Sequence, residues 1–305
     1  MVWLAIEQTL NGLQLGVTLF LITAGLTLSF GVMGVVNLAH GSLYMVGAYI
    51  AAFTGLQTGS FAIGIATALA AVTLIGLVLE LSVMRVLYLR DHMDQVLATF
   101  ALILIFNGGT TWIFGRQPYQ IETPRFLGGA IEFTSEFSYP AYRFALIGVG
   151  VAISILLYFV IAKTRIGMLV RAGSTHRDLV RALGVNLPSV FTIIFAFGAS
   201  LAGLAGALVG PVQAVQVGMG DPMVILAFVV IVIGGVGSVR GALVASVLVG
   251  IVDAFGRAVV PQVLKAVVEP GVASAIGVAI SATSVYLLMA AVLIVRPSGL
   301  FAGRV

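Results

Sequence analysis

The stretch Phe61-Ala-Ile-Gly-Ile-Ala-Thr-Ala-Leu-Ala-Ala-Val-Thr-Leu-Ile-Gly-Leu-Val-Leu-Glu-Leu-Ser-Val-Met84 decides the fold class, because Glu80 is its one charged residue. As an α-helix it would be ~36 Å long, enough to cross a hydrocarbon core of about 30 Å. A run of this length and polarity is typical of a transmembrane helix.

The rest of the chain has the same character. Of its 305 residues 60% are hydrophobic and 9% charged, and the mean hydropathy is +1.17, whereas soluble domains are about 25% charged. We expect an all-α polytopic membrane protein with roughly 8–9 transmembrane helices, in one domain over residues 1–305. The predicted spans are 13–36, 41–57, 61–84, 95–115, 142–162, 189–211, 222–236, 241–260 and 272–295. The short segment 222–236, which ends in a glycine-rich sequence, could instead be re-entrant.

Lys and Arg set the orientation, because they accumulate in the short cytoplasmic connections. With the C-terminus inside, ten of the fifteen lie in inner connections and five in outer ones. This places residues 171–188 in the cytoplasm and 116–141 outside, where they would form a lid or a passive connector. The first basic residue is Arg85, so we expect no cleavable signal peptide and take the first apolar run as a span.

The longest polar interruption on the basic side is Arg171-Ala-Gly-Ser-Thr-His-Arg-Asp-Leu-Val-Arg-Ala-Leu-Gly-Val-Asn-Leu-Pro188. Ser174 or Thr175 can cap a helix N-terminus, Gly184 stands where a left-handed C-terminal residue is needed, and Pro188 can open the next helix. The segment therefore predicts a short amphipathic helix. It is either a solvated surface helix or a docking element for a partner protein.

Two apolar runs are interrupted in the same way. Gly34-Val-Val-Asn-Leu-Ala-His-Gly-Ser-Leu43 aligns with Gly234-Gly-Val-Gly-Ser-Val-Arg-Gly-Ala-Leu243. Interrupted helices at corresponding positions indicate a transport path, because their freed backbone groups must face protein or water. The candidates for lining that path are Asn37, His40, Gly41 and Ser42, with helix breaking as the alternative role.

Several chemistries are missing. The two lysines complete no phosphate-binding loop, the three histidines are dispersed, and cysteine is absent, so we expect no ATP site, metal or cofactor in this chain. The acidic residues near the spans, Glu80, Asp221 and Asp253, are few for an ion-coupled pump.

The sequence Gly218-Met-Gly-Asp221 has the pattern of intramembrane aspartyl proteases, which need a second aspartate in a neighbouring span. Asp253 is the one candidate, but Arg257 lies one turn beyond it and predicts a structural salt bridge. Asp221 is itself explained as the N-cap of a helix that Pro222 opens.

Four segments in order resemble the LivH-type permeases of bacterial ABC importers for branched-chain amino acids. They are the part around Asn37-Leu-Ala-His-Gly41, the run Thr164–Ala172 followed by Arg181-Ala-Leu-Gly-Val-Asn186, the loop Gly234–Ala242, and the tail Arg296-Pro-Ser-Gly-Leu-Phe301. The usual EAA pattern of ABC permeases is only loosely present, in Asp178–Gly184.

The resemblance implies a permease subunit of the bacterial inner membrane, not an enzyme, that translocates branched-chain amino acids or related small amino acids and amides. Its expected partners are a homologous LivM-like second permease, two cytoplasmic ATPases that bind the ATP, a periplasmic substrate-binding protein and membrane lipid, and not nucleic acid. The segment 171–188 would couple to the ATPases through Arg171, Ala172, Arg177, Asp178, Arg181, Ala182 and Gly184. The alternatives are a stand-alone secondary transporter or channel, and the intramembrane aspartyl protease.

Overall fold

The computed structural model describes residues 2–165, 167–169, 172, 182, 184–265 and 269–301. Within these residues the chain is almost entirely helical. Its α-helices are α1 (Val2–Met33), α2 (His40–Thr58), α3 (Phe61–Leu79), α4 (Arg85–Leu87), α5 (His92–Phe114), α6 (Ala141–Lys163), α9 (Leu187–Val209), α10 (Gly220–Gly234), α11 (Val239–Leu264) and α12 (Pro270–Val295). A π-helical turn, η1 (Glu80–Met84), joins α3 to α4, so that the two run on as one rod, and a 3₁₀ turn, η2 (Arg125–Leu127), lies in the long connection.

Each predicted span corresponds to a helix. In the described part of the chain seven helices are long and apolar enough to cross a membrane, and α2 and α10 account for the other two predicted spans. The helix α1 begins at Val2 instead of residue 13, because Glu7, Gln8 and Asn11 are polar but compatible with a helix. The helix α10 has 15 residues and is ~22 Å long, less than the thickness of the hydrocarbon core.

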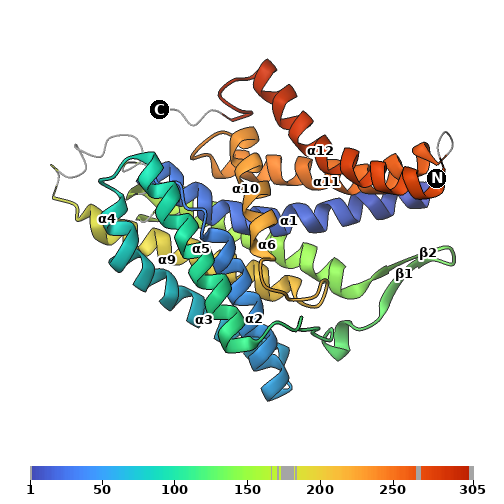
Figure 1. The fold of residues 1–305 in the computed structure, drawn as a ribbon, viewed down its shortest axis with the longest axis horizontal. Coiled ribbons are helices and arrows are strands. Elements are labelled where there is room, and N and C mark those ends of the chain that lie inside the picture. Colours follow the sequence, from blue (N-terminus) through green and yellow to red (C-terminus); the bar gives the residue numbers. More distant parts are fainter. Residues whose placement is uncertain are drawn as a thin grey trace.

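The two central helices are α1 and α9, and the others pack around them. The helix α1 runs along α11 on one side and α9 on the other, while α2, α3 and α9 pack against one another. Figure 1 shows α2, α3 and α5 on one side of α1, and α11 and α12 on the other. Most of the core therefore lies on α1, α2 and α9, whose central residues are buried, whereas α5, α6 and α12 expose most of their surface.

Two glycines of α1, Gly12 and Gly16, make a close contact between α1 and α11. A Cβ atom at Gly12 would lie 2.7 Å from the Ile251 Cα, and one at Gly16 would lie 2.9 Å from the Val247 Cα. Such distances do not occur between real atoms, so only glycine permits this approach of the two backbones. Close backbone packing of this kind is a main source of helix association in lipid, where there is no hydrophobic driving force between helices.

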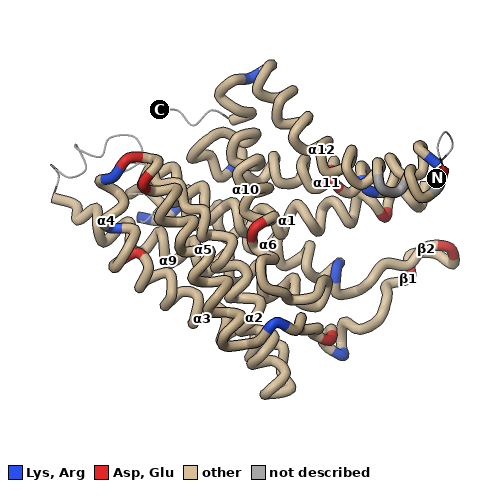
Figure 2. Tube along the Cα trace, viewed as in Figure 1, with Lys and Arg blue, Asp and Glu red and all other residues tan. Residues whose placement is uncertain are grey.

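Charged residues are sparse along the bundle and gather in the connections and at helix ends (Figure 2). Connections that the sequence analysis placed on the same side contact each other. Tyr119, in the connection after α5, forms a β-bridge with Val215, in the connection after α9. On the other side, the backbone N–H of Val36 donates to Gln95, at the start of α5. The contacts agree with the alternating topology.

The connection 116–141 contains a short antiparallel hairpin of β1 (Ala130–Thr134) and β2 (Phe137–Pro140), with Ile131 opposite Tyr139. The hairpin rests on the N-terminal turns of α1: the Trp3 indole N–H donates to Glu136 over 3.0 Å, and the Tyr139 hydroxyl donates to Asn11 over 3.1 Å. The polar start of α1 thus has partners outside the predicted span.

The prediction that Asp221 is an N-cap is wrong by two residues. The helix α10 begins at Gly220 with Met219 at the N-cap, and Asp221 lies in the first turn. Gly218 has a φ of 83°, and its carbonyl accepts from the Asp221 N–H over 3.0 Å, so the chain already turns before the aspartate. A carboxylate in the first turn still interacts favourably with the helix dipole.

Candidate functional site

The first polar break lies between α1 and α2. Gly34 ends α1 with a φ of 70°, and its N–H donates to the Phe30 carbonyl over 2.9 Å. Residues 34–37 are irregular, and 38 and 39 form a turn before α2. The amide of Gln95 holds the break, since its Oε1 accepts from the Val36 N–H over 3.2 Å and its Nε2 donates to the Leu87 and Arg90 carbonyls. Sequence analysis missed Gln95, although a buried amide at the start of an apolar run was a signal for it.

After the break the chain returns into the bundle. His40, the first residue of α2, donates from Nε2 to the Ile22 carbonyl over 3.1 Å. Ile22 lies eleven residues before Met33, the end of α1, which corresponds to ~16 Å along the helix. The N-terminus of α2 therefore lies about half a membrane thickness inside the end of α1.

The start of α10 lies at the same depth. A Cβ on Gly41 would collide with the Gly220 carbonyl and would lie 3.0 Å from the Val224 Cβ, so the first turns of α2 and α10 meet backbone to backbone. The approach to α10 is tied to α2 as well: Gln213 donates to the Tyr44 hydroxyl over 3.0 Å, and the Gly218 N–H points at the Met45 sulfur over 3.2 Å. For neither helix start do the described residues provide a side-chain cap.

Two helix N-termini that meet inside a membrane are a suitable place for an anionic group, because each carries the positive end of a helix dipole. The surroundings are polar but incompletely paired. Within the described residues, four buried polar atoms on α1 and around the start of α2 lack a hydrogen-bond partner: Thr23 Oγ1, Thr27 Oγ1, Asn37 Oδ1 and Ser42 Oγ. Each such atom costs about 1–3 kcal/mol when it stays unpaired. These atoms therefore mark a place where a polar ligand or water would be stabilised.

The four residues predicted to line a path are placed together. All four are buried, and Asn37, His40 and Ser42 are each 1% exposed. The fourth, Gly41, makes the contact with Gly220. Gly41 itself is covered by the first turn of α10.

The predicted coupling residues fall largely outside the described residues, as Arg171, Arg177, Asp178 and Arg181 do. Of the others, Ala172 is half-buried, and Ala182 and Gly184 are exposed. Gly184 has the predicted left-handed conformation, with a φ of 81°. Pro188 lies in the first turn of α9, where the Asn186 side chain accepts from the Ser189 N–H as the cap.

A buried carboxylate joins the start of α9 to the end of the α3–α4 rod. Glu80 is fully buried in η1; its Oε2 accepts from Thr192 of α9 over 2.6 Å and pairs with Arg85 over 3.4 Å. Tyr88 donates to Oε1 over 3.2 Å. Burial and the Glu80 charge both raise the pKa of Tyr88, so the phenol stays protonated and remains a donor. Sequence analysis considered Glu80 only as a proton carrier and missed Thr192 and Tyr88.

The predicted salt bridge in α11 is confirmed. Arg257 Nε lies 2.7 Å from Asp253 Oδ2, with Asp253 buried and Arg257 largely exposed. Asp253 therefore has an arginine as its partner, whereas an aspartyl protease needs two carboxylates that share one proton. The geometry at Asp253 is thus that of a structural ion pair.

Comparison with known proteins gives one consistent result. The family described as "Branched-chain amino acid transport system / permease component" matches residues 8–297. The chain is 28% identical to the high-affinity branched-chain amino acid transport system permease protein BraD of Pseudomonas aeruginosa, over 97% of this chain and 95% of that protein. It is 26% identical to LivH of Escherichia coli strain K12, over 97% and 94%. It is also 27% identical to a probable LivH of Methanocaldococcus jannaschii, over 78% and 76%. No solved structure matches.

Proposed function

Because the chain belongs to the family of permease components of branched-chain amino acid transport systems, we propose that it passes such amino acids across the membrane at the contact between α2 and α10. The chain is a multi-pass membrane subunit of an ABC transporter, and ATP is bound by partner ATPases. The specific partners that we propose are a homologous second permease, two ATPases and a periplasmic binding protein. The proposed cellular site is the bacterial inner membrane.

One observation carries the proposal for the path: two uncapped helix N-termini meet near mid-depth beside buried polar atoms without partners, as far as the described residues go. Branched-chain amino acids are zwitterions with an apolar side chain. The positive dipole ends of α2 and α10 would stabilise the carboxylate, and Asn37 Oδ1 or Ser42 Oγ would accept from the ammonium group. Discontinuous helices at the midplane are a common way to build such a site.

The domain proposal keeps residues 1–305 as one permease domain and 171–188 as its coupling segment. A continuous set of contacts supports a link from that segment to the break. Thr192, close behind it on α9, bonds to Glu80, and Glu80 bonds to Tyr88, whose hydroxyl also lies 3.5 Å from the sulfur of Met33 at the end of α1. Close to Tyr88 in the chain, the carbonyls of Leu87 and Arg90 accept from the Gln95 side chain, which in turn accepts from the Val36 N–H of the break. We propose that movement of α9 reaches the break along this route.

Reconstitution tests the function. Vesicles that contain this chain, its second permease and its ATPases should take up radiolabelled leucine only when ATP and the binding protein are present. Uptake by this chain alone, driven by an ion gradient and indifferent to ATP, would establish the secondary transporter instead.

Coupling has its own test in the same vesicles. Gly184→Pro and Arg181→Glu should leave ATP hydrolysis in place while leucine uptake falls at least about tenfold, the effect of losing a docking contact worth ~1.4 kcal/mol. Thr192→Val should give the same pattern, because it removes the donor to the buried Glu80 carboxylate. A matched control is Thr73→Val on α3, whose hydroxyl bonds to its own helix at Leu69. If uptake per ATP hydrolysed stays unchanged in the first three variants, the coupling assignment is wrong.

A further inference from the structure

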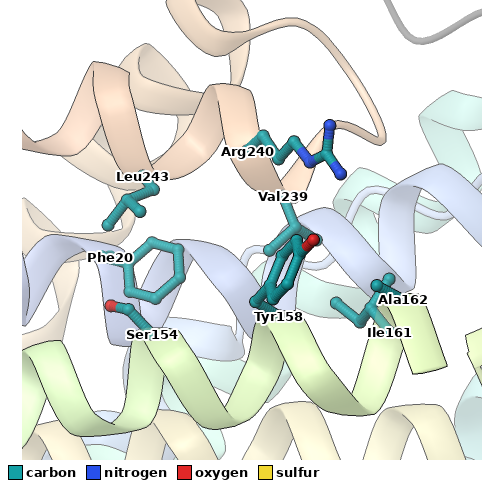
Figure 3. Close-up of a pocket in the computed structure, with 8 residues that line it drawn as sticks. All are labelled: Phe20, Ser154, Tyr158, Ile161, Ala162, Val239, Arg240 and Leu243. Atoms are coloured by element: carbon teal, nitrogen blue, oxygen red, sulfur yellow. The ribbon is translucent and has the colours of Figure 1, made fainter. Parts of the chain in front are cut away.

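A groove lies between α6 and α11 on the side of the bundle away from the break. Both helices pack on α1, and Figure 3 shows Phe20 of α1 among the residues that line the groove between them. The cavity has a volume of about 220 Å³ and is lined by apolar side chains, with Arg240, the Tyr158 hydroxyl and Ser154 as its polar residues. Because Tyr158 is 47% exposed, the groove is open to the surroundings of the helix bundle.

The depth of the groove matches one leaflet of a bilayer. Along α6 its lining runs from Ser154 to Ala162, next to Lys163, the last residue of the helix. From Ser154 to Lys163 the helix rises ~14 Å, and one leaflet of the hydrocarbon core is about 15 Å deep. An apolar slot of this depth, parallel to the spans, has the dimensions of an acyl chain.

The inner end of the groove is positively charged. The guanidinium of Arg240 lies 5.6 Å from the centre of the Tyr158 ring, a cation–π contact, and Lys163 ends α6 on the same side. Among the described residues neither cation has a carboxylate within 4.0 Å. Moreover, Arg240 is in the first turn of α11, where a cation interacts unfavourably with the helix dipole. An anion at this position would interact favourably with both Arg240 and the α11 N-terminus.

We propose that this groove binds an anionic phospholipid, with one acyl chain between α6 and α11 and the phosphate at Arg240. Tyr158 lies at the depth where the ring is in apolar surroundings and the hydroxyl reaches the headgroup region, as tyrosines at membrane interfaces do. Basic pockets between helices on the cytoplasmic side are known to select anionic headgroups. In the topology deduced from the basic residues, Arg240 and Lys163 are on that side.

A neighbouring cavity shows what the groove would lack without Arg240. It has a volume of about 150 Å³, lies between α1, α6 and α9, and shares Ile161 with the groove, but its lining, which includes Leu28, Ile194 and Phe197, is entirely apolar. A chain there would have no charged group to fix its headgroup. Selectivity for an anionic lipid is therefore expected at the α11 side of α6 and not at the α9 side.

Native mass spectrometry of the purified full-length chain tests the proposal, with phosphatidylglycerol and phosphatidylcholine of the same acyl chains as probes. Phosphatidylglycerol should bind more tightly to the wild-type chain. Arg240→Gln should weaken its binding about fivefold, as expected for one basic residue near a headgroup, and leave phosphatidylcholine unchanged. Ser154→Phe, which places a ring in the groove, should weaken both lipids. The matched control is Arg296→Gln, an exposed arginine at the end of α12 that does not line the groove.

Three outcomes would overturn the proposal. One is an equal loss of phosphatidylglycerol in Arg240→Gln and Arg296→Gln, which would mean general attraction to a basic surface. The second is a Ser154→Phe variant that binds both lipids as the wild type does. The third is displacement of the lipid when the complete transporter assembles, which would assign the groove to a protein subunit. Thermal unfolding of each variant shows that it is folded, so a loss of binding can be read directly.

Discussion

The two aligned breaks, residues 34–43 and 234–243, differ in how they begin the next helix. At the second break Ser238 caps α11, since its hydroxyl accepts from the Gly241 N–H over 3.0 Å, and the turn closes within four residues. At the first break Ala39 occupies the N-cap position and contributes no side-chain cap, and α2 starts far inside the bundle. The same spacing of glycines thus gives a simple turn in one place and a buried, incompletely paired helix start in the other.

The residues that differ between the two breaks explain the result. Asn37 and His40, both buried, align with Gly237 and Arg240, both exposed. A polar side chain in a membrane interior is costly and commonly marks a functional site. We therefore propose that the substrate passes at the first break and that the second break is a structural turn. Four variants test this proposal.

The largest effect is expected at the contact between the helix starts. Gly41→Val places a branched side chain against the Gly220 carbonyl and should destabilise the protein by about 3 kcal/mol or more and abolish leucine uptake. The measurement is thermal unfolding together with uptake in the reconstituted transporter. Gly108→Val on α5 is the control, because a Cβ there meets nothing within 4 Å. A Gly41→Val variant as stable and active as Gly108→Val would show that α2 and α10 do not meet as described.

Effects of intermediate size are expected from Asn37→Ala and Gly237→Ala, and they should be opposite: the first lowers uptake and spares stability, and the second lowers stability and spares uptake. Asn37→Ala removes a buried, unpaired Oδ1, so stability should stay unchanged or rise, while uptake falls about tenfold through the loss of a hydrogen bond to a charged substrate. Gly237→Ala forces a Cβ into a φ of 78° and should lower stability by ~1–2 kcal/mol, with uptake per folded molecule unchanged. Should both variants lower stability and spare uptake, the first break would be structural as well.

The smallest effect is expected at the cap of α11. Ser238→Ala removes the acceptor for the Gly241 N–H and should cost about 1 kcal/mol in unfolding free energy, with normal uptake. Chemical denaturation measures the first quantity and the vesicle assay the second. A loss of uptake beyond the loss of folded protein would mean that the second break also takes part in transport.

Much of the fold could be read from the sequence, because a transmembrane helix is specified by its own apolar run. The spans, the left-handed Gly184 and the Asp253–Arg257 pair all rest on residues near one another in the chain or on one helix. The contacts that could not be read are those between distant segments. Thr192 bonds to Glu80 and Gln95 to Val36 across separate helices, and periodicity carries no information on which helix lies beside which.

The position of the candidate site was predicted better than its geometry. Glycine and polar residues inside an apolar run showed where the helix would break. That α2 would begin ~16 Å inside the end of α1 depends on His40 reaching Ile22 and on Gly41 meeting Gly220, which are tertiary contacts. The error at Asp221 has the same origin, since the turn at Gly218 is fixed by the surroundings of Met45.

The meeting of Gly41 with Gly220 also bears on the kinetics of the transporter. At this point the barrier is backbone on both sides, so no side chain can swing aside to open it by degrees. Opening requires α10 or α2 to shift as a rigid unit, and packed interfaces change between discrete arrangements instead of deforming continuously. A single transporter observed over time should therefore stay for long periods in a few discrete conformations and change abruptly from one to the next. While it stays in one conformation, its leak of substrate should be close to zero.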